Sequence, residues 1–340
     1  MISKQIEFAS AGVVAIATRE IDLSDLKVNE VVIQNEASII SSGTELANLY
    51  AVGRKNPVFP YYPGYGAIGR IIAKGSGVTD FEIGERTYFA GKHASVQKFE
   101  HANEEQWSHL FKIDQRLDPV EGVVGCMAEI ALTAPNITPL KLNDTVAIFG
   151  LGIVGVLASM LYKIYGAKVI GLDPVKERCA LAKRVGIETV IDALPEAQVE
   201  ELKKITGGRG ADITVDCVGH SAVICNCVKG TAYMGQIVLL GTPRAPYESD
   251  MNPMLQDVHV RGLVMRGALL ERYPLKKDRF GSEMSVEWAL QTVFELIGTR
   301  RLDVRPLLSH VISYGEAPQT YRGLHEQLSH YTSAVIDWRL

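Results

Sequence analysis

The segment Val146–Gly155 (VAIFGLGIVG) restricts the fold of this 340-residue chain more than any other stretch. A short apolar run of the kind that forms a buried strand leads into Gly150, Gly152 and Gly155, which have the spacing G-x-G-x-x-G, and a helix-like apolar run follows. The first glycine allows a tight turn, the second lets the backbone approach a pyrophosphate, and the third lets helix and strand pack closely. The segment therefore predicts a strand–turn–helix unit that binds a dinucleotide, the alternative being a glycine-rich turn without a ligand.

The residues after this turn indicate which dinucleotide it would take. Ile153 and Val154 begin the expected helix, whose N-terminus offers free N–H groups and a positive dipole to phosphates. Asp173 ends the next strand (KVIGLD), 23 positions after Gly150, where a carboxylate bonds a ribose 2′-hydroxyl and repels a 2′-phosphate. Capping the next helix is the other role open to Asp173, and Arg178 either flanks the adenosine or is a solvated helix residue. The pattern favours NAD over NADP.

The middle of the chain alternates between short apolar strands and helices, which predicts a parallel sheet with helices on both faces. Residues 1–115 contain only short Val- and Ile-rich runs divided by turn signals, as is typical of an irregular β domain. A helix is expected at 285–297, followed by short strands. We therefore expect an α/β fold in which a doubly wound parallel sheet of the Rossmann type (128–265) is inserted in a β-rich domain (1–127 and 266–340).

Composition excludes several classes of protein. A hydrophobic fraction of 47% and a charged fraction of 22% are those of a globular chain, and a net charge of −4 gives no general attraction to nucleic acid. The longest apolar run, Val146–Tyr162, is better explained by the strand–turn–helix unit than by a membrane span. Charges interrupt the apolar stretches near the N-terminus, and the five cysteines form no C-x-x-C pair, so we expect a cytoplasmic protein without nucleic-acid or membrane partners.

Several motifs together resemble one family. The run GLGIVG…GLDPVKERCALAKRVG…TGGRGADITVDCVG…GQIVLLG, the N-terminal ISSGTEL, PGYGAIGRIIAKGSGVTDFEIGER and KHASV, and the C-terminal RLDVRPLLSHVISYGEAPQTY are similar to the medium-chain dehydrogenase/reductase superfamily, which includes the zinc alcohol dehydrogenases. The resemblance spans nearly the whole chain in the family's motif order. It implies a GroES-like catalytic domain, hydride transfer between NAD(H) and a small alcohol or ketone, and a homodimer, or a dimer of dimers, that pairs through the last Rossmann strand near Val258–Gly267.

The chain departs from this family at the zinc ligands. Residues 42–45 read SGTE where zinc members carry C-G-x-D, and residues 64–66 read GYG where they carry G-H-E. The third ligand position falls near Cys126, and the four-cysteine structural-zinc lobe is missing. Serine hydroxyls and tyrosine phenols are poor zinc ligands at neutral pH, because their pKa values lie far above 7. We expect a member that holds no metal.

Without a metal, a side chain has to polarise the substrate oxygen. Thr44 matches the family's hydroxyl relay position, and Tyr65 replaces the zinc-binding histidine and could donate to a developing alkoxide or simply fill the site. Glu45 is expected to act as base, to orient Ser42 or Thr44, or to be an exposed acid. His93 is either catalytic or structural. Around the nicotinamide, the resemblance implies contacts from Val218, Gly219, Leu240, Gly241, Thr242 and Met265.

Three functions are compatible with these residues. The first is a zinc-independent NAD-dependent dehydrogenase of a polar secondary alcohol such as a sugar or cyclitol; this class follows from a weaker similarity to the bacteriochlorophyllide dehydrogenase-like subgroup. The second is an NAD(P)H-dependent quinone or enoyl reductase, since those relatives also lack zinc. The third is a non-catalytic cofactor-binding protein on the same scaffold.

Overall fold

The computed structural model describes residues 1–52, 57–102, 106–243, 245–277, 284–327 and 329–340. The chain divides into two compact units. What we call the β unit comprises Met1–Cys126, Tyr273–Arg300 and Leu308–Leu340, and the parallel-sheet unit comprises Met127–Arg272 and Arg301–Leu307. The division after Arg272 comes later in the chain than the expected boundary at residue 265, and the short return piece of the parallel-sheet unit was not expected.

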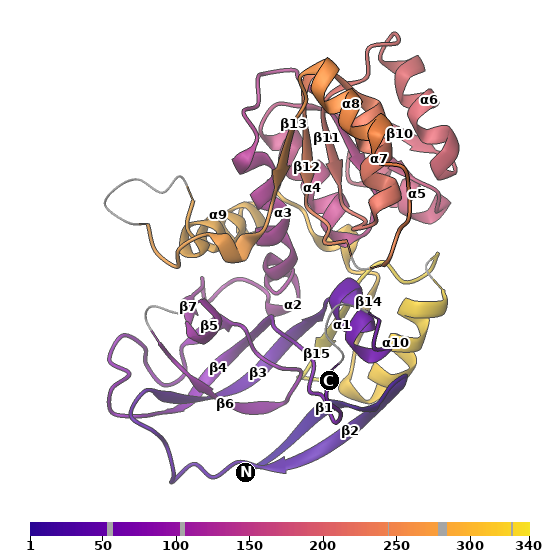
Figure 1. Cartoon of the computed structure of the whole chain (residues 1–340). Helices are drawn as coiled ribbons and strands as arrows, with labels where there is room; N and C mark the ends of the chain where they lie inside the picture. The colour runs from indigo at the N-terminus through magenta and orange to yellow at the C-terminus, as the bar shows by residue number, and fades with distance from the viewer. Residues whose placement is uncertain (53–56, 103–105, 244, 278–283, 328) are drawn as a thin grey trace. The chain divides into compact units, whose positions relative to one another are not determined.

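Within the described residues, six parallel strands form the sheet of the parallel-sheet unit (Figure 1). They are β8 (Thr145–Phe149), β9 (Lys168–Asp173), β10 (Thr189–Asp192), β11 (Ala211–Asp216), β12 (Thr231–Leu239) and β13 (Val264–Gly267). Their order is β10-β9-β8-β11-β12-β13, so the direction of progression reverses between β8 and β11. This is the order of dinucleotide-binding Rossmann folds, and the expected doubly wound sheet is confirmed. In such sheets ligands bind beyond the carboxyl ends of the strands at the reversal point.

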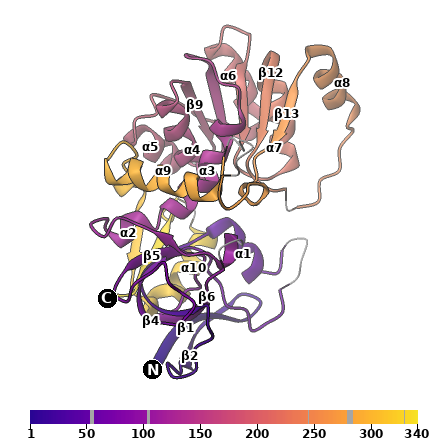
Figure 2. The ribbon, with the colours of Figure 1, turned by 90° about the vertical axis from the view of Figure 1, so that its left-hand side faces the viewer.

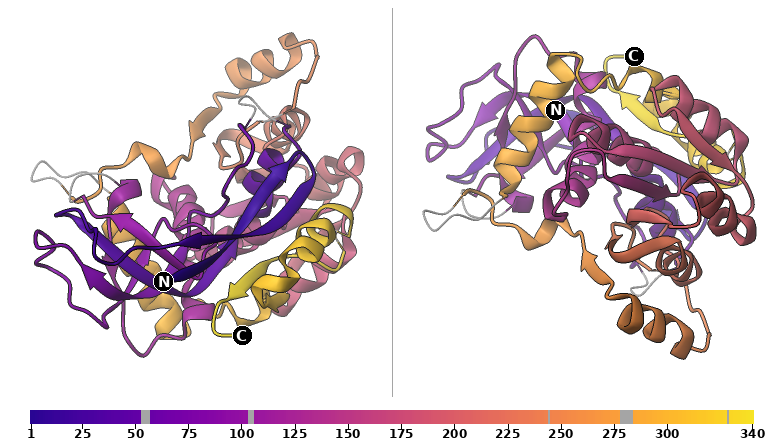
Figure 3. Two further views of the ribbon diagram at one scale, coloured as in Figure 1. Left: turned by 90° about the horizontal axis from the view of Figure 1, so that it is seen from below. Right: turned by 90° about the horizontal axis from the view of Figure 1, so that it is seen from above.

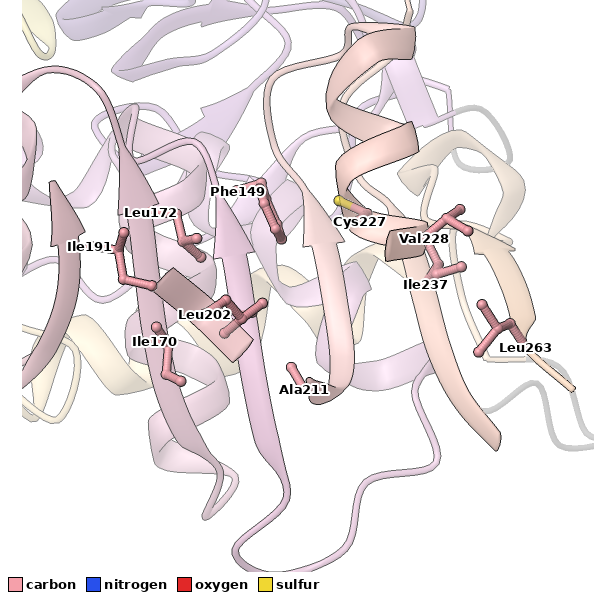
Figure 4. Packing of buried hydrophobic residues seen from close by; sticks show 11 residues of the cluster. Phe149, Ile170, Leu172, Ile191, Leu202, Ala211, Cys227, Val228, Ile237 and Leu263 are labelled. Carbon is pink, nitrogen blue, oxygen red and sulfur yellow. The ribbon is translucent and has the colours of Figure 1, made fainter. Parts of the chain in front are cut away.

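The helices of this unit connect successive strands and cover the sheet. They are α4 (Ile153–Ile164), α5 (Lys176–Arg184), α6 (Pro195–Ile205), α7 (Ser221–Gly230) and α8 (Asn252–Arg261), with the short turns η2 (Leu270–Arg272) and η3 (Arg305–Leu307). Leu202 of α6 and Val228 of α7 pack with strand residues such as Phe149, Leu172 and Ile237 in a fully buried cluster (Figure 4). Burial of this apolar face fixes the strand ends that carry the candidate site.

The β unit is built on an antiparallel sheet that the C-terminal segment completes. Its strands are β3 (Glu30–Ile40), β4 (Ala67–Lys74), β5 (Arg86–Phe89), β6 (Val96–Glu100), β7 (Phe111–Lys112), β14 (His310–Ile312) and β15 (Ala334–Asp337), in the order β14-β15-β3-β4-β5-β7 with β6 also on β3. β15 lies antiparallel to β3, and β14 is parallel to β15. The expected β-rich domain is confirmed, and its sheet unites segments from both ends of the chain.

Helices and a hairpin surround this sheet. They are α1 (Ser42–Leu49), α2 (Pro119–Gly122), α3 (Gly125–Ile137, which runs on into the parallel-sheet unit), α9 (Val286–Gly298) and α10 (Ala317–Glu326), the turns η1 (Gln106–Ser108) and η4 (Tyr314–Glu316), and the hairpin of β1 (Ile2–Ser10) and β2 (Val13–Glu20). α10 runs alongside β2 (Figure 3). A core of fully buried residues, including Phe8, Ile40 and Tyr321, joins the hairpin, the sheet and α10.

One helical stretch, Pro119–Ile137, is long and apolar enough to cross a membrane by length and composition alone. It comprises α2 and α3, and 78% of its apolar window is buried inside the protein, as in the core helix of a globular fold. The cytoplasmic location stays a prediction from the sequence.

Candidate dinucleotide and substrate sites

The glycine turn between β8 and α4 has the geometry of a phosphate cradle. Gly150 has φ +95°, and a Cβ on Gly155 would overlap the carbonyl oxygen of Gly150, so neither position tolerates a side chain easily. A Cβ on Gly152, in contrast, would meet nothing within 4 Å. No side chain caps α4, whose first turn begins with Ile153 and Val154. Its leading N–H groups therefore lie open beside an empty space above Gly152, which is what a pyrophosphate requires.

Asp173 lies at the end of β9, beside this turn, and is nearly fully buried. Its Oδ2 accepts the N–H of Leu151 at 2.7 Å, and its Oδ1 accepts the N–H of Val175 at 2.8 Å. Nη1 of Arg178 lies 3.7 Å from Oδ2, and the buried Nε of Arg178 has no partner. The carboxylate thus braces the glycine turn and the start of α5, while a cation with an unsatisfied donor stands beside it.

Asp216, at the end of β11, organises a second pair of loops. Its Oδ1 accepts the N–H groups of Val218 (2.9 Å) and Gly219 (3.1 Å), and its main-chain carbonyl accepts those of Leu240 (3.0 Å) and Gly241 (2.8 Å). Burial raises the pKa of the Asp216 carboxyl, and the two bonds to Oδ1 lower it. A Cβ on Gly241 would overlap the N–H of Gly219, so the two loops lie backbone against backbone.

The sequence did not single out Asp216, although an acid two residues before a V-G turn is a usable signal. Thr242 continues the second of these loops, and its carbonyl lies against Gly219. Met265 lies in the middle of β13, opposite Ile237, whereas Gly267 is the residue at the carboxyl end of that strand. The structure therefore gathers the glycine turn, Asp173, the Val218 loop and the Leu240 loop at one edge of the sheet, and leaves Met265 short of it. These groups fit a dinucleotide.

In the β unit, Tyr65 lies at the centre of a group of hydroxyls. Its phenol donates a hydrogen bond to Oγ of Ser41, the residue that precedes α1. Burial raises the pKa of the Tyr65 phenol, as do the nearby Cys126 and Glu45, whereas hydrogen bonds with Ser41 and Thr44 lower it. The net direction of the pKa shift is upward, so the phenol stays protonated, and its one proton is donated to Ser41 in this structure. Sequence reasoning found Thr44 and Tyr65 but placed Ser42, rather than Ser41, beside them.

Glu45 and His93 form a buried pair. Nε2 of His93 lies 3.1 and 3.3 Å from the two carboxylate oxygens of Glu45, and both residues are at most 1% exposed. Nδ1 of His93 lies 2.8 Å from Oγ of Ser38. The reading of Glu45 as an exposed acid is therefore wrong, because the residue lies on the inner face of α1. Both ring nitrogens of His93 are engaged, which leaves no free one for a substrate.

The donor set of this region does not fit a catalytic zinc ion. Across the stretches that the structure describes, no three His, Cys, Asp or Glu side chains come together as ligands. Cys126 is buried with its Sγ against Gly66, and Tyr65 carries a phenol whose pKa is raised. A tight zinc site needs three good ligands, and the described residues do not bring three together.

An aromatic ring contacts Tyr65, and further aromatic and polar groups lie near Glu45. Trp107 of η1 is 48% exposed, and its ring meets the ring of Tyr65 edge to face at a centroid distance of 6.3 Å. Nδ2 of Asn48 donates to the hydroxyl of Tyr61 at 3.3 Å, and Nζ of Lys92 lies 5.8 Å from the centre of the Tyr61 ring. Burial lowers the pKa of Lys92. The residues present both flat apolar faces and hydrogen-bonding groups.

Comparison with known proteins adds to this geometry. The family described as "Zinc-binding dehydrogenase" matches residues 154–277. Over 257 residues the chain is 27% identical to the D-guloside 3-dehydrogenase of Escherichia coli K12, covering 75% of this chain and 71% of that protein. The structure of galactitol-1-phosphate dehydrogenase from Escherichia coli has the same fold, with a TM-score of 0.82 and 19% identity over 98% of this chain and 99% of that one.

Two other solved structures of this fold contain a cofactor. One, from Sinorhizobium meliloti 1021, is described as a putative zinc-binding dehydrogenase bound to NADP (TM-score 0.79, 20% identity, 99% of both chains covered). The other, from Escherichia coli CFT073, is described as an alcohol dehydrogenase complexed with NADH (TM-score 0.80, 17% identity, 99% of both chains covered).

The Rossmann sheet with its glycine turn, the completed β unit and these relatives define an oxidoreductase scaffold of the alcohol dehydrogenase type. The matching dehydrogenase domain and these relatives support membership of the medium-chain dehydrogenase/reductase superfamily, which the sequence motifs resemble.

Proposed function

We propose that the chain is an NAD-dependent dehydrogenase that interconverts a polar secondary alcohol and its ketone without zinc. The observation that carries the proposal is the hydroxyl cluster around Tyr65. The phenol stands at the position where zinc members of the superfamily carry a histidine ligand, and it is held by Ser41.

The cofactor part of the proposal rests on the glycine turn and on Asp173. The open N–H groups at the start of α4 are suited to the pyrophosphate. A carboxylate beside that turn disfavours a 2′-phosphate, which supports NAD. Arg178, with its unpartnered Nε, would favour an extra phosphate, so the choice between NAD and NADP is the first point to measure.

The chemical part rests on hydrogen bonding to the substrate oxygen. Bound NAD would supply the acceptor for the hydride of the carbinol carbon. The hydroxyl proton would leave through Thr44, the residue at the family's relay position, to solvent, and the substrate oxygen gains negative charge as this proton departs. Tyr65 stays protonated and can stabilise this charge by turning its one O–H from Ser41 to the substrate oxygen, with Thr44 beside it. In the reverse direction the same donor polarises the ketone. Glu45 and His93 are buried and mutually bonded, so we assign them a structural role rather than a contact with the substrate.

The substrate class is argued from the groups around the cluster. Tyr61, Asn48 and Lys92 offer hydrogen bonds, and Trp107 offers a flat apolar face. Polyhydroxylated rings present both kinds of surface, so a sugar, glycoside or cyclitol is the class we propose. The similarity to a protein described as a D-guloside 3-dehydrogenase points the same way.

A substrate screen tests this proposal. Purified protein with NAD is offered a panel of sugars, glycosides, cyclitols and simple secondary alcohols, and formation of reduced nicotinamide is followed by absorbance. We expect turnover of at least one polyhydroxylated substrate and little activity on simple alcohols. Turnover confined to quinones or enoyl thioesters with NADPH would replace the proposal by the reductase alternative. Tight NAD binding without any turnover would favour a non-catalytic role.

A further inference from the structure

A series of buried and partly buried hydrogen bonds links the C-terminal segment of the β unit to Tyr65. The phenol of Tyr321, on α10, donates to Oε2 of Glu45, although the two residues are 276 positions apart. Oε1 of Glu45 accepts the main-chain N–H of Ser41 at 2.9 Å. Oγ of Ser41 in turn accepts the hydroxyl of Tyr65. These bonds connect Tyr321 to Tyr65 through the carboxylate of Glu45 and then through the backbone and side chain of Ser41.

The N-terminus of α1 lacks the usual side-chain cap, and the hydrogen bonds between Glu45, Ser41 and Tyr65 explain why. Ser41 precedes the helix, at the position where a serine hydroxyl usually accepts an N–H of the first turn, yet it makes no such bond. Glu45 instead holds the backbone of Ser41, and the serine hydroxyl is turned to Tyr65. The hydroxyl of Ser41 therefore bonds Tyr65 instead of capping α1.

The far side of Glu45 is fixed just as firmly. Because a carboxylate only accepts hydrogen bonds, Nε2 of His93 must carry a proton toward it. Nδ1 of His93 lies against Oγ of Ser38. The same Oγ accepts a hydrogen bond at 2.9 Å from Nε1–H of Trp338, the residue that follows β15. Glu45 is thus held by its own helix, by the loop before β6 and by α10. A buried carboxylate is tolerated only where donors surround it in this way.

We propose that Tyr321 is a positioning residue for the reaction: through Glu45 and Ser41 it fixes the direction in which the Tyr65 hydroxyl points. The part of this proposal that concerns catalysis rests on the proposed function, whereas the part that concerns the geometry of Tyr65 does not. If Tyr321 lacks its phenol hydroxyl, Oε2 of Glu45 retains only the hydrogen bond from His93. The carboxylate can then rotate, and its hydrogen bond with the N–H of Ser41 is lost.

The test compares two buried tyrosines. Tyr321→Phe removes the donor to Glu45, and Tyr162→Phe removes an equally buried hydroxyl, bonded to Thr138 at 3.0 Å in the parallel-sheet unit. In protein labelled with ¹³Cζ-tyrosine, with the signal of Tyr65 identified by its loss in Tyr65→Phe, we expect that signal to shift in Tyr321→Phe and to stay in place in Tyr162→Phe. We also expect kcat to fall about tenfold in Tyr321→Phe only, with the Kd of NAD unchanged; groups that orient metal ligands typically contribute tenfold or more.

The outcomes separate the two claims. A folded Tyr321→Phe protein in which the Tyr65 signal and kcat are both unchanged overturns the positioning role. If the wild-type protein turns over no substrate, the proposed function fails, and the NMR signal alone decides whether Tyr321 positions Tyr65. Should Tyr321→Phe fail to fold, Glu45→Gln carries the same test, because it retains the shape of the side chain but weakens the link between Tyr321 and Ser41.

Discussion

Tyr65 and Thr44 are the side chains on which the proposed chemistry depends at the scale of single residues. Tyr65→Phe and Thr44→Val keep the shape of each side chain and delete only a hydroxyl. Removing one preorganised donor to a developing oxyanion costs about 10²–10³ in turnover, or about 2.7–4 kcal/mol. We predict that each variant lowers kcat at least ~tenfold in steady-state assays. The affinity for NAD should remain within a few-fold, because the cofactor groups belong to the parallel-sheet unit. Near-normal turnover in both variants would contradict the role of the cluster.

Asp173 and Arg178 have opposite expected effects on the preference between NAD and NADP. We predict that NAD binds at least ~tenfold more tightly than NADP, which is about 1.4 kcal/mol, in fluorescence titrations of both. Asp173→Asn should narrow the difference, because it removes the charge that repels a 2′-phosphate, and Arg178→Gln should widen it, because it removes an attracting cation. Equal affinities in the wild-type protein would remove the role assigned to Asp173.

The sequence predicts the position of a residue best when its neighbours in the fold are also close in sequence. Asp173 does lie beside the glycine turn, because strand, turn and strand end are close in sequence. Ser41 and Tyr321 could not be found in this way. The hydroxyl of Ser41 points to a loop some two dozen residues on, and the partner of Tyr321 lies at the other end of the chain, so only the folded β unit reveals either contact.

The glycine turn gives the sharpest test at the scale of elements. Gly152→Ala adds a methyl group to open space at an ordinary φ of −65°, so we expect at most about 1 kcal/mol of lost stability at this capping position. The methyl group would occupy the space proposed for the pyrophosphate, and NAD affinity should fall at least ~tenfold by titration. Gly155→Ala is the matched comparison. Its Cβ would overlap the carbonyl of Gly150, and we expect a loss of about 1–3 kcal/mol in thermal unfolding. Unchanged NAD affinity in Gly152→Ala would exclude this cradle.

Element boundaries show where sequence patterns stop being informative. The expected helix at 285–297 agrees closely with α9, which has Ser285 as a capping residue and a continuous apolar face. Helix α7 ends at Gly230, because Thr231 enters β12, where its hydroxyl bonds Thr214 and the carbonyl of Cys227. α8 was missed. None of its residues is fully buried, and Met254 and Val258 form a partly buried apolar pair only one turn long, so the sequence pattern is weak; the helix projects beside β13 (Figures 2 and 3).

Assembly is the question at the scale of the whole molecule. β13 is an edge strand with Val264 43% and Met265 38% exposed, and none of the residues of α8, the helix that precedes it, is fully buried. An unprotected edge of this kind invites pairing with a second copy, and two-fold pairing is the commonest arrangement. We propose a homodimer, or a tetramer built from it. Light scattering at micromolar concentration should show the dimer, and Val264→Lys should convert it to a folded monomer. A monomeric wild-type protein would exclude this assembly.

The most direct test of the account is to measure zinc content and turnover on one sample. The protein is dialysed against a chelator, its zinc is quantified by mass spectrometry, and NAD-dependent oxidation of the best polyhydroxylated substrate is assayed before and after dialysis. Because Ser42 and Tyr65 stand at the sequence positions of two metal ligands, and no three His, Cys, Asp or Glu side chains come together in the described residues, we predict well under one zinc per chain and unchanged turnover. A stoichiometric zinc ion whose removal abolishes turnover, and whose return restores it, would contradict the metal-independent mechanism.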